Sequence, residues 1–236
     1  MKTFSSLRAG ALVVAALVVA GCTTTPTVQT SQEPTHDGLY PVKSTRLKQV
    51  WALPDVDYTG YTKIGLQGLG IHYRPVKESN ARRSLSSGVS EFPIGESERA
   101  NLEKMAREVF VEEIAKIEGF QFVDASTNKG SDVLYMRAGL LDVVSRVPPE
   151  PMGRSDVYLD SVGQATLVVE LVDAESGTVL ARAVDARAAD SNGPPIRSNS
   201  VVNSSEVKRL LRNWSIQLRK ALENLARDVG ALPSSS

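Results

Sequence analysis

Apolar residues alternate with polar or small ones in several stretches of the chain, and this period of two predicts β-strands. The stretches are Lys63–Val76, Phe120–Val123, Val133–Val147, Gln164–Asp173 and Thr178–Ala188. The turn sequence from Asp173 to Gly177 predicts that the last two strands form a hairpin. We therefore expect a sheet of about five strands, mostly antiparallel.

Apolar residues recur at every third or fourth position in two further stretches, which predicts two amphipathic helices. Ser97 can cap the first helix, which Gly119 ends, and Ser204 or Ser205 can cap the second. The apolar positions are Leu102, Met105, Val109, Phe110, Ile114 and Ile117, then Val207, Leu211, Trp214, Leu218, Ala221, Leu222 and Leu225. The predicted fold is α+β, with both helices packed on one face of the sheet. The second helix is also basic enough to lie on an anionic membrane, but covering the sheet is the favoured interpretation.

The apolar run from Ala9 to Ala20 follows Lys2 and Arg8 and leads through small residues to Cys22, the only cysteine. This pattern is typical of a lipoprotein signal peptide, and the run is shorter than the roughly 20 residues of a membrane-spanning helix. We predict cleavage of residues 1–21 and lipidation of Cys22 with diglyceride and palmitate chains. An uncleaved anchor or an ordinary signal peptide would leave one unpaired thiol in a secreted protein.

The remaining chain divides by composition. Residues 22–37 are rich in Thr, Gln, Ser and Pro, which predicts a lipidated flexible tether. We predict that residues 38–230 form a single α+β domain and that residues 231–236 form a disordered tail. Three polar loops are expected within the domain, at Asn80–Glu96, Pro148–Asp156 and Asp190–Asn203. Thr23, in place of an aspartate after the lipidated cysteine, favours the outer membrane, with the domain facing the periplasm.

Several segments resemble the domain of unknown function 3313 family of bacterial lipoproteins. The segments are Gly38–Tyr40, Ser44–Leu47, Tyr58–Ile64, Val162–Ala165, Glu170–Asp173 and Gly177. The resemblance extends from about Gly38 to Val229. It implies an envelope lipoprotein, and because the family has no assigned activity it implies no catalytic residues.

The inventory of reactive side chains argues against an enzyme. The only histidines are His36, in the predicted tether, and His72, at a strand end, and no serine lies in a Gly-x-Ser-x-Gly motif. With Cys22 lipidated, thiolate metal sites are excluded. The carboxylates Glu108, Glu112 and Glu113 have Lys104 and Lys116 nearby, which favours solvated ion pairs over a metal site. We predict no catalytic, metal or cofactor-binding residues. The glycines between Gly65 and Gly70 do not have the spacing of the dinucleotide fingerprint.

Charge and anchor together point to a binding role. Removal of Lys2 and Arg8 with the signal peptide leaves two more acidic than basic residues, and no basic cluster suits nucleic acid. We therefore predict a non-catalytic accessory or interaction module of the cell envelope, with a membrane contact through acylated Cys22 and an envelope protein as partner. The alternative is an envelope carrier of a small molecule, lipid or glycan, held between sheet and helices. Trp51, Tyr58 and Tyr61 either pack an N-terminal arm onto the domain or form a recognition surface.

Overall fold

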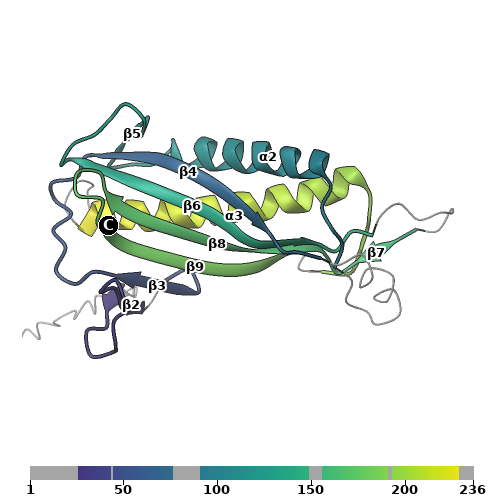
Figure 1. Cartoon of the computed structure of the whole chain (residues 1–236), viewed down its shortest axis with the longest axis horizontal. Coiled ribbons are helices and arrows are strands. Elements are labelled where there is room, and N and C mark those ends of the chain that lie inside the picture. Colours follow the sequence, from purple (N-terminus) through teal and green to yellow (C-terminus); the bar gives the residue numbers. More distant parts are fainter. Residues whose placement is uncertain (1–25, 44, 77–90, 149–155, 191–192, 229–236) are drawn as a thin grey trace, which may run out of the picture.

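The computed structural model describes residues 26–43, 45–76, 91–148, 156–190 and 193–228. It is an α+β fold in which two helices lie behind one large mixed sheet (Figure 1). The predicted fold class is therefore confirmed. Cys22, the signal peptide and the C-terminal tail lie outside the described residues, so their predictions stay predictions.

The main sheet has eight strands in the order β1-β2-β3-β9-β8-β6-β4-β5. Their bounds are β1 Thr27–Val28, β2 Tyr40–Lys43, β3 Gln49–Ala52, β4 Lys63–Tyr73, β5 Gln121–Val123, β6 Val133–Ser145, β8 Ser161–Asp173 and β9 Val179–Asp190. A separate two-stranded ribbon joins β7, Tyr158–Leu159, to β10, Ile196–Arg197. All five predicted strands are present within a few residues of their expected bounds.

The predicted number of five strands is wrong, whereas the predicted mostly antiparallel pairing holds for five of the seven strand pairs of the main sheet. Strands β1, β2 and β3 add to one edge, and each has at most four residues, too few for an alternating pattern to be recognised. The exception is β4, which pairs in parallel with both β5 and β6. A parallel connection needs a crossover, and the first helix, α2 (Glu96–Ile114), lies between β4 and both of its parallel partners in the chain.

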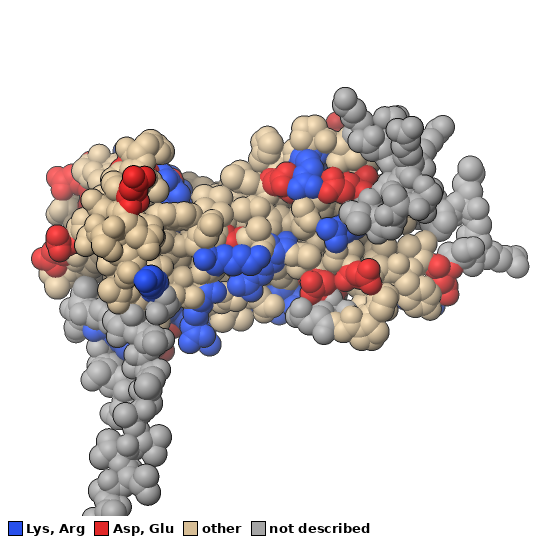
Figure 2. All heavy atoms as spheres, turned by 90° about the horizontal axis from the view of Figure 1, so that it is seen from below, with Lys and Arg blue, Asp and Glu red and all other residues tan. Residues whose placement is uncertain are grey.

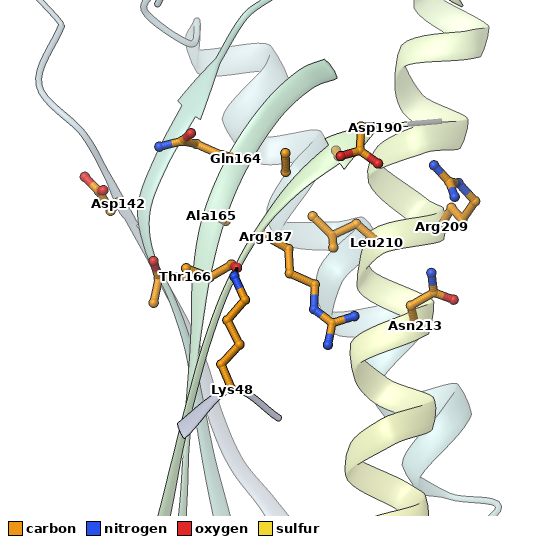
Figure 3. Close-up of a pocket in the computed structure, with 13 residues that line it drawn as sticks. Lys48, Asp142, Gln164, Ala165, Thr166, Arg187, Asp190, Arg209, Leu210 and Asn213 are labelled. Carbon is orange, nitrogen blue, oxygen red and sulfur yellow. Dashed lines mark hydrogen bonds between the residues drawn. The ribbon is translucent and has the colours of Figure 1, made fainter. Parts of the chain in front are cut away.

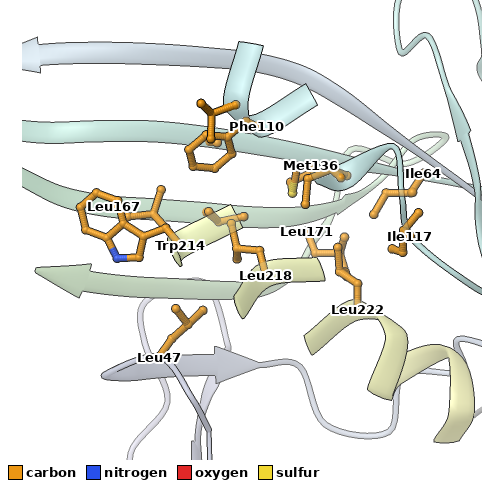
Figure 4. Close-up of a cluster of buried hydrophobic side chains, with 14 of the residues drawn as sticks. Leu47, Ile64, Phe110, Ile117, Met136, Leu167, Leu171, Trp214, Leu218 and Leu222 are labelled. Carbon is orange, nitrogen blue, oxygen red and sulfur yellow. The ribbon is translucent and has the colours of Figure 1, made fainter. Parts of the chain in front are cut away.

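The second helix, α3 (Ser200–Asp228), packs with α2 against the inner face of the sheet. Figure 4 shows Trp214 and Leu218 of α3 facing Leu167 and Met136 of the strands, with Phe110 of α2 beside them. Trp214 is fully buried. The interpretation that α3 covers the sheet is therefore confirmed, and apolar side chains fill the layer between sheet and helices.

Both helices begin earlier than predicted. Gly95 is the N-cap of α2, so Ser97 lies inside the helix, where its hydroxyl donates to Glu98 instead of capping. In α3, Asn199 accepts a hydrogen bond from the backbone N–H of Val202 at 3.0 Å, the capping interaction that was expected at Ser204 or Ser205. Part of the predicted loop Asp190–Asn203 is thus helix, and β10 occupies another part.

The N-terminal arm is more ordered than its composition predicts. β1 pairs with β2, and Asp37 forms a 2.5 Å ion pair with Arg182 of β9. The prediction of a flexible tether over residues 22–37 stays a prediction, although backbone pairing and one ion pair connect residues 26–37 to the domain. Tyr58 and Tyr61 pack against the main core, as the first interpretation of these aromatics expects.

The predicted loops Asn80–Glu96 and Pro148–Asp156 lie largely outside the described residues. Neither α2 nor α3 combines the length and the hydropathy that a membrane-spanning helix requires.

Candidate functional site

Strand β9 is longer than β3, its neighbour on the side away from β8. β3 pairs only with Ala181–Val184 of β9, whereas β8 pairs with β9 as far as Asp190. Within the described ranges, no strand pairs with residues 185–189 of β9 on the side of β3. We call this segment the β9 edge. An unpaired strand edge offers main-chain donors and acceptors to another chain.

Two hydrogen bonds to β9 show to which side the main-chain groups of the β9 edge point. The backbone N–H of Leu53 donates to the carbonyl of Leu180 at 2.8 Å, and the Lys48 ammonium donates to the carbonyl of Ala186. Successive residues of a strand turn their N–H and C=O groups to opposite sides. The main-chain groups of Ala186 and Ala188 therefore point away from β8, toward the open side.

A groove of about 510 Å³ runs along this edge. Figure 3 shows it between the strands and α3, with Lys48 at one end and Arg209 on the helix side. It is lined by Lys48, Asp142, Gln164, Ala165, Thr166, Ala186, Arg187, Ala188, Ala189, Asp190, Arg209, Leu210 and Asn213. Five consecutive residues of β9 are among them, so the groove gives direct access to the strand's main chain.

Ion pairs hold most charged side chains of the groove in place. Arg187 donates through Nε to Asp185 at 2.7 Å and through Nη2 to Gln217 at 2.9 Å. Arg209 pairs with Glu206, one turn back on α3. Asp142 is bound by Arg74, whose guanidinium lowers the pKa of that carboxyl.

Lys48 differs from the other cations of the groove. Its ammonium donates to a main-chain carbonyl, and no acidic side chain in the part of the chain that the structure describes pairs with it. Figure 2 shows Lys and Arg side chains gathered near the middle of the face on which β9 and β3 lie. The groove can therefore accept an anionic group without displacing an existing ion pair.

The wall of the groove rests on a buried carboxylate. Asp185 is 1% exposed and accepts hydrogen bonds from Arg187 and from the indole N–H of Trp214, at 3.1 Å. Its second oxygen, Oδ1, has no partner among the described residues. This network fixes the Arg187 guanidinium at the groove wall.

The acidic residues singled out from the sequence have different environments. Glu108 and Glu112 are exposed and pair with Lys104 and Lys116, as predicted. Glu113 also pairs with Lys116, but its prediction as solvated is wrong, because it is 7% exposed and binds Arg219 of α3 at 3.0 Å. Burial raises the pKa of the Glu113 carboxyl, yet the hydrogen bonds from both cations outweigh burial and lower it overall.

The two histidines are exposed, and His36 lies in the arm before β2 while His72 lies near the end of β4. No cluster of three or more His, Cys, Asp or Glu suited to a metal ion occurs among the residues described.

Sequence reasoning missed the β9 edge, because the edge depends on the lengths of two strands that lie about 130 residues apart in the chain. The one available signal was the set of three alanines near the end of the predicted strand, Ala186, Ala188 and Ala189.

Comparison with known proteins assigns no family to this chain. No family model matches the sequence, and a search of curated proteins found no match. Among solved structures, a PelC dodecamer from Paraburkholderia phytofirmans is 14% identical, with 72% of this chain and 94% of that chain covered and a TM-score of 0.33.

Two further structures are similarly distant. A Xanthomonas campestris protein of family DUF330 is 13% identical, with 78% and 95% of the two chains covered and a TM-score of 0.38. A putative neuraminyllactose-binding hemagglutinin homologue from Helicobacter pylori is 13% identical, with 73% and 94% covered and a TM-score of 0.39. At this level of similarity, the activities and assemblies of these proteins are not transferred to the present chain.

Proposed function

We propose that this protein is a non-catalytic interaction module of the bacterial cell envelope that binds a protein partner along the β9 edge. The observation that carries the proposal is the open side of Ala186–Ala189, where main-chain groups meet a groove of about 510 Å³. Extended segments add to such edges through main-chain hydrogen bonds, while side-chain pockets provide specificity.

In this proposal the anchor holds the β1 end of the domain close to a membrane surface. In our proposal Cys22 carries the acyl chains and holds the protein in the outer membrane, facing the periplasm. Pro26, where the described chain begins, is the fourth residue after Cys22, and a chain of that length spans at most about 14 Å. The domain is then held near the lipid headgroups, where it meets membrane-bound partners. Membership of the domain of unknown function 3313 family also stays a prediction.

The alternative of a carrier with a ligand between sheet and helices finds less support. Trp214, Phe110 and Met136 fill that layer, and each is at most 1% exposed. A cavity for a lipid or glycan would require these side chains to move. The groove at the β9 edge, by contrast, lies open at the surface.

Site-specific photo-crosslinking in intact cells tests the proposal. A crosslinking amino acid at Ala186, an exposed position in the groove, is compared with one at Glu108, exposed on α2. We expect one discrete protein adduct from position 186, absent from position 108 and lost in Cys22→Ala, and we expect the purified partner to bind the purified protein. Equal adducts from both positions, or adducts with lipid or glycan alone, would contradict the proposal.

A further inference from the structure

The groove begins at the point where β3 begins. β3 runs antiparallel to β9, and its first residue, Gln49, lies opposite Val184. Lys48 directly precedes it and reaches along the edge to the carbonyl of Ala186. A further strand that continued the antiparallel pairing would run from Ala189 toward Ala186. Its last residue would arrive beside the Lys48 ammonium.

The main chain of β9 suits such a strand. Ala186 and Ala188 both point their N–H and C=O groups outward, toward an added antiparallel strand. The Ala186 carbonyl already accepts from Lys48, so the N–H of the added strand would use its second lone pair. Antiparallel pairing is also slightly more stable per residue than parallel pairing. The segment from Ala186 to Ala189 is about 10 Å long at the usual rise of a strand, enough for the last three or four residues of a peptide.

A chain terminus fits the end of the groove better than an internal segment does. A partner strand continuing beyond Ala186 would meet Lys48 and then the residues of β3, which already occupy the pairing positions at Ala181–Val184. A strand that stops opposite Ala186 avoids this collision. Its α-carboxylate would lie next to an ammonium group that has no acidic partner in the described structure, and charge-assisted hydrogen bonds of this kind are among the stronger ones.

Building on the proposed function, we propose that the β9 edge binds the extended C-terminal segment of an envelope protein, with the free carboxylate held by Lys48. The last residue pairs with Ala186, the last but one with Arg187, and the one before it with Ala188. The side chain of the last residue lies over Ala186 and that of the third residue from the end lies over Ala188, on the open face of the sheet. Because both alanines are small, bulky or aromatic side chains fit there. The side chain of the last residue but one faces Arg187, which favours an acidic or polar residue.

A second copy of this chain is a poorer occupant of the groove. Its β9 edge is an internal segment, so it would bring main-chain groups to the groove but no terminal carboxylate to Lys48. Self-pairing would also bring the Lys48 ammonium groups of two copies toward one shared groove, and neither has an acidic partner in the described structure. Like charges on neighbouring strands are unfavourable.

The test uses a library of random nine-residue peptides displayed with a free C-terminus and selected against the full acylated protein in detergent. The best selected peptide is synthesised as the acid and as the C-terminal amide, and binding is measured by fluorescence anisotropy. We expect amidation to weaken binding at least tenfold. Lys48→Ala should weaken binding of the acid about tenfold and leave binding of the amide unchanged, whereas Lys220→Ala, an exposed lysine of α3, should change neither.

A second variant tests the strand pairing itself. Ala188→Pro removes one outward N–H, and proline is tolerated on edge strands whose N–H faces solvent. We expect it to abolish binding of both peptide forms while circular dichroism shows an unchanged fold. If this variant does not fold, the comparison of Lys48→Ala on acid and amide still decides the proposal.

Three results would overturn the proposal: no peptide is selected, acid and amide bind equally, or Lys48→Ala weakens both forms alike. A dimer that Ala188→Pro dissociates would identify a second copy as the occupant instead. The crosslinking at Ala186 distinguishes a failure of the C-terminal binding mode from a failure of the proposed function. If the protein adduct persists while the carboxylate has no effect, the interaction module stands and only the C-terminal mode of binding is wrong.

Discussion

The indole N–H of Trp214 on α3 donates to Oδ2 of Asp185 on β9 at 3.1 Å, and both side chains are almost completely buried. The same oxygen accepts from Arg187, whose side chain lines the groove. The core of the domain and the wall of its candidate binding site therefore share one carboxylate. Asp185 thus links Trp214 of α3 to Arg187 at the wall of the groove.

Replacing Trp214 with phenylalanine keeps most of the apolar volume but removes the donor to Asp185. We expect the free energy of unfolding to fall by about 2 kcal/mol or more, because a buried charged group loses a hydrogen bond. Urea denaturation measures this change. Trp51→Phe is the control, since Trp51 lies half-buried in β3 and its indole has no hydrogen bond in the described structure. Equal losses in the two variants would show that volume, and not the hydrogen bond, determines the effect.

The Glu113–Arg219 contact between the helices makes stability depend on pH. Because Lys116 and Arg219 lower the pKa of Glu113 in the folded state, its contribution is complete above the ordinary value of 4.5 and is lost as the pH falls below it. Glu113→Gln should cost about 3 kcal/mol at pH 7, because removing one partner leaves buried charge uncompensated.

Urea denaturation at several pH values between 7 and 3 measures this dependence. The difference between wild type and Glu113→Gln should narrow as the pH falls. Glu112→Gln is the control, because Glu112 is exposed and its pair with Lys116 contributes little. A difference that stays constant down to pH 3 would mean that packing, not charge, makes Glu113 important.

The parts of the fold that the sequence predicted are those where one face of an element is continuously apolar. Alternation in β6 and β8, and the stripe of Leu211, Trp214 and Leu218, reflect local periodicity and are independent of what lies beside them. The short strands β1–β3 are held by pairing with strands distant in sequence, so they leave almost no local pattern.

Glu113 shows a second limit of sequence reasoning. On the helix it belongs to the polar side, and only the packing of α3 against α2 brings Arg219 over it and buries it. The β9 edge is a similar case, because it exists only where a twelve-residue strand lies beside a four-residue one. The burial of Glu113 and the β9 edge each depend on how two elements pack or pair, so neither can be predicted from a single stretch of sequence.

The N-terminal arm should detach from the sheet in acid. Asp37 accepts hydrogen bonds from Thr35 at 2.5 Å and from Arg182 at 2.5 Å, and these lower the pKa of its carboxyl to about 2. The stabilisation is therefore complete above the ordinary value of 3.8 and is lost as the pH falls toward 2. We expect faster hydrogen exchange at the buried Leu39, relative to the core of β8, over this range.

Asp37→Asn should accelerate exchange at Leu39 already at pH 6 and remove its acid dependence. Asp55→Asn, a change in the exposed turn after β3, is the matched control and should have neither effect. If Leu39 exchanges at the same rate in wild type and Asp37→Asn, the arm is held by the β1–β2–β3 pairing alone, without a contribution from the ion pair.

Gly163 allows the close approach of β6 and β8 beside the groove. A Cβ atom at this position would lie 2.5 Å from the carbonyl oxygen of Val144, and backbone cannot move aside as a flexible side chain can. Gly163 also pairs with Ala189, so a displacement of β8 here would shift the β9 edge. We expect Gly163→Ala to reduce the free energy of unfolding by about 2 kcal/mol, within the range for overpacked sites.

Gly68→Ala is the comparison for this prediction, because nothing lies within 4 Å of a Cβ at Gly68 in β4. There the substitution should be neutral or should stabilise by up to about 1 kcal/mol, since glycine loses more backbone entropy on folding than alanine. Urea denaturation measures both variants. A loss at Gly68 equal to that at Gly163 would mean that the sheet needs flexibility in both strands. A loss at Gly163 alone, together with weaker binding of the selected peptide, would show that the β6–β8 spacing sets the position of the β9 edge.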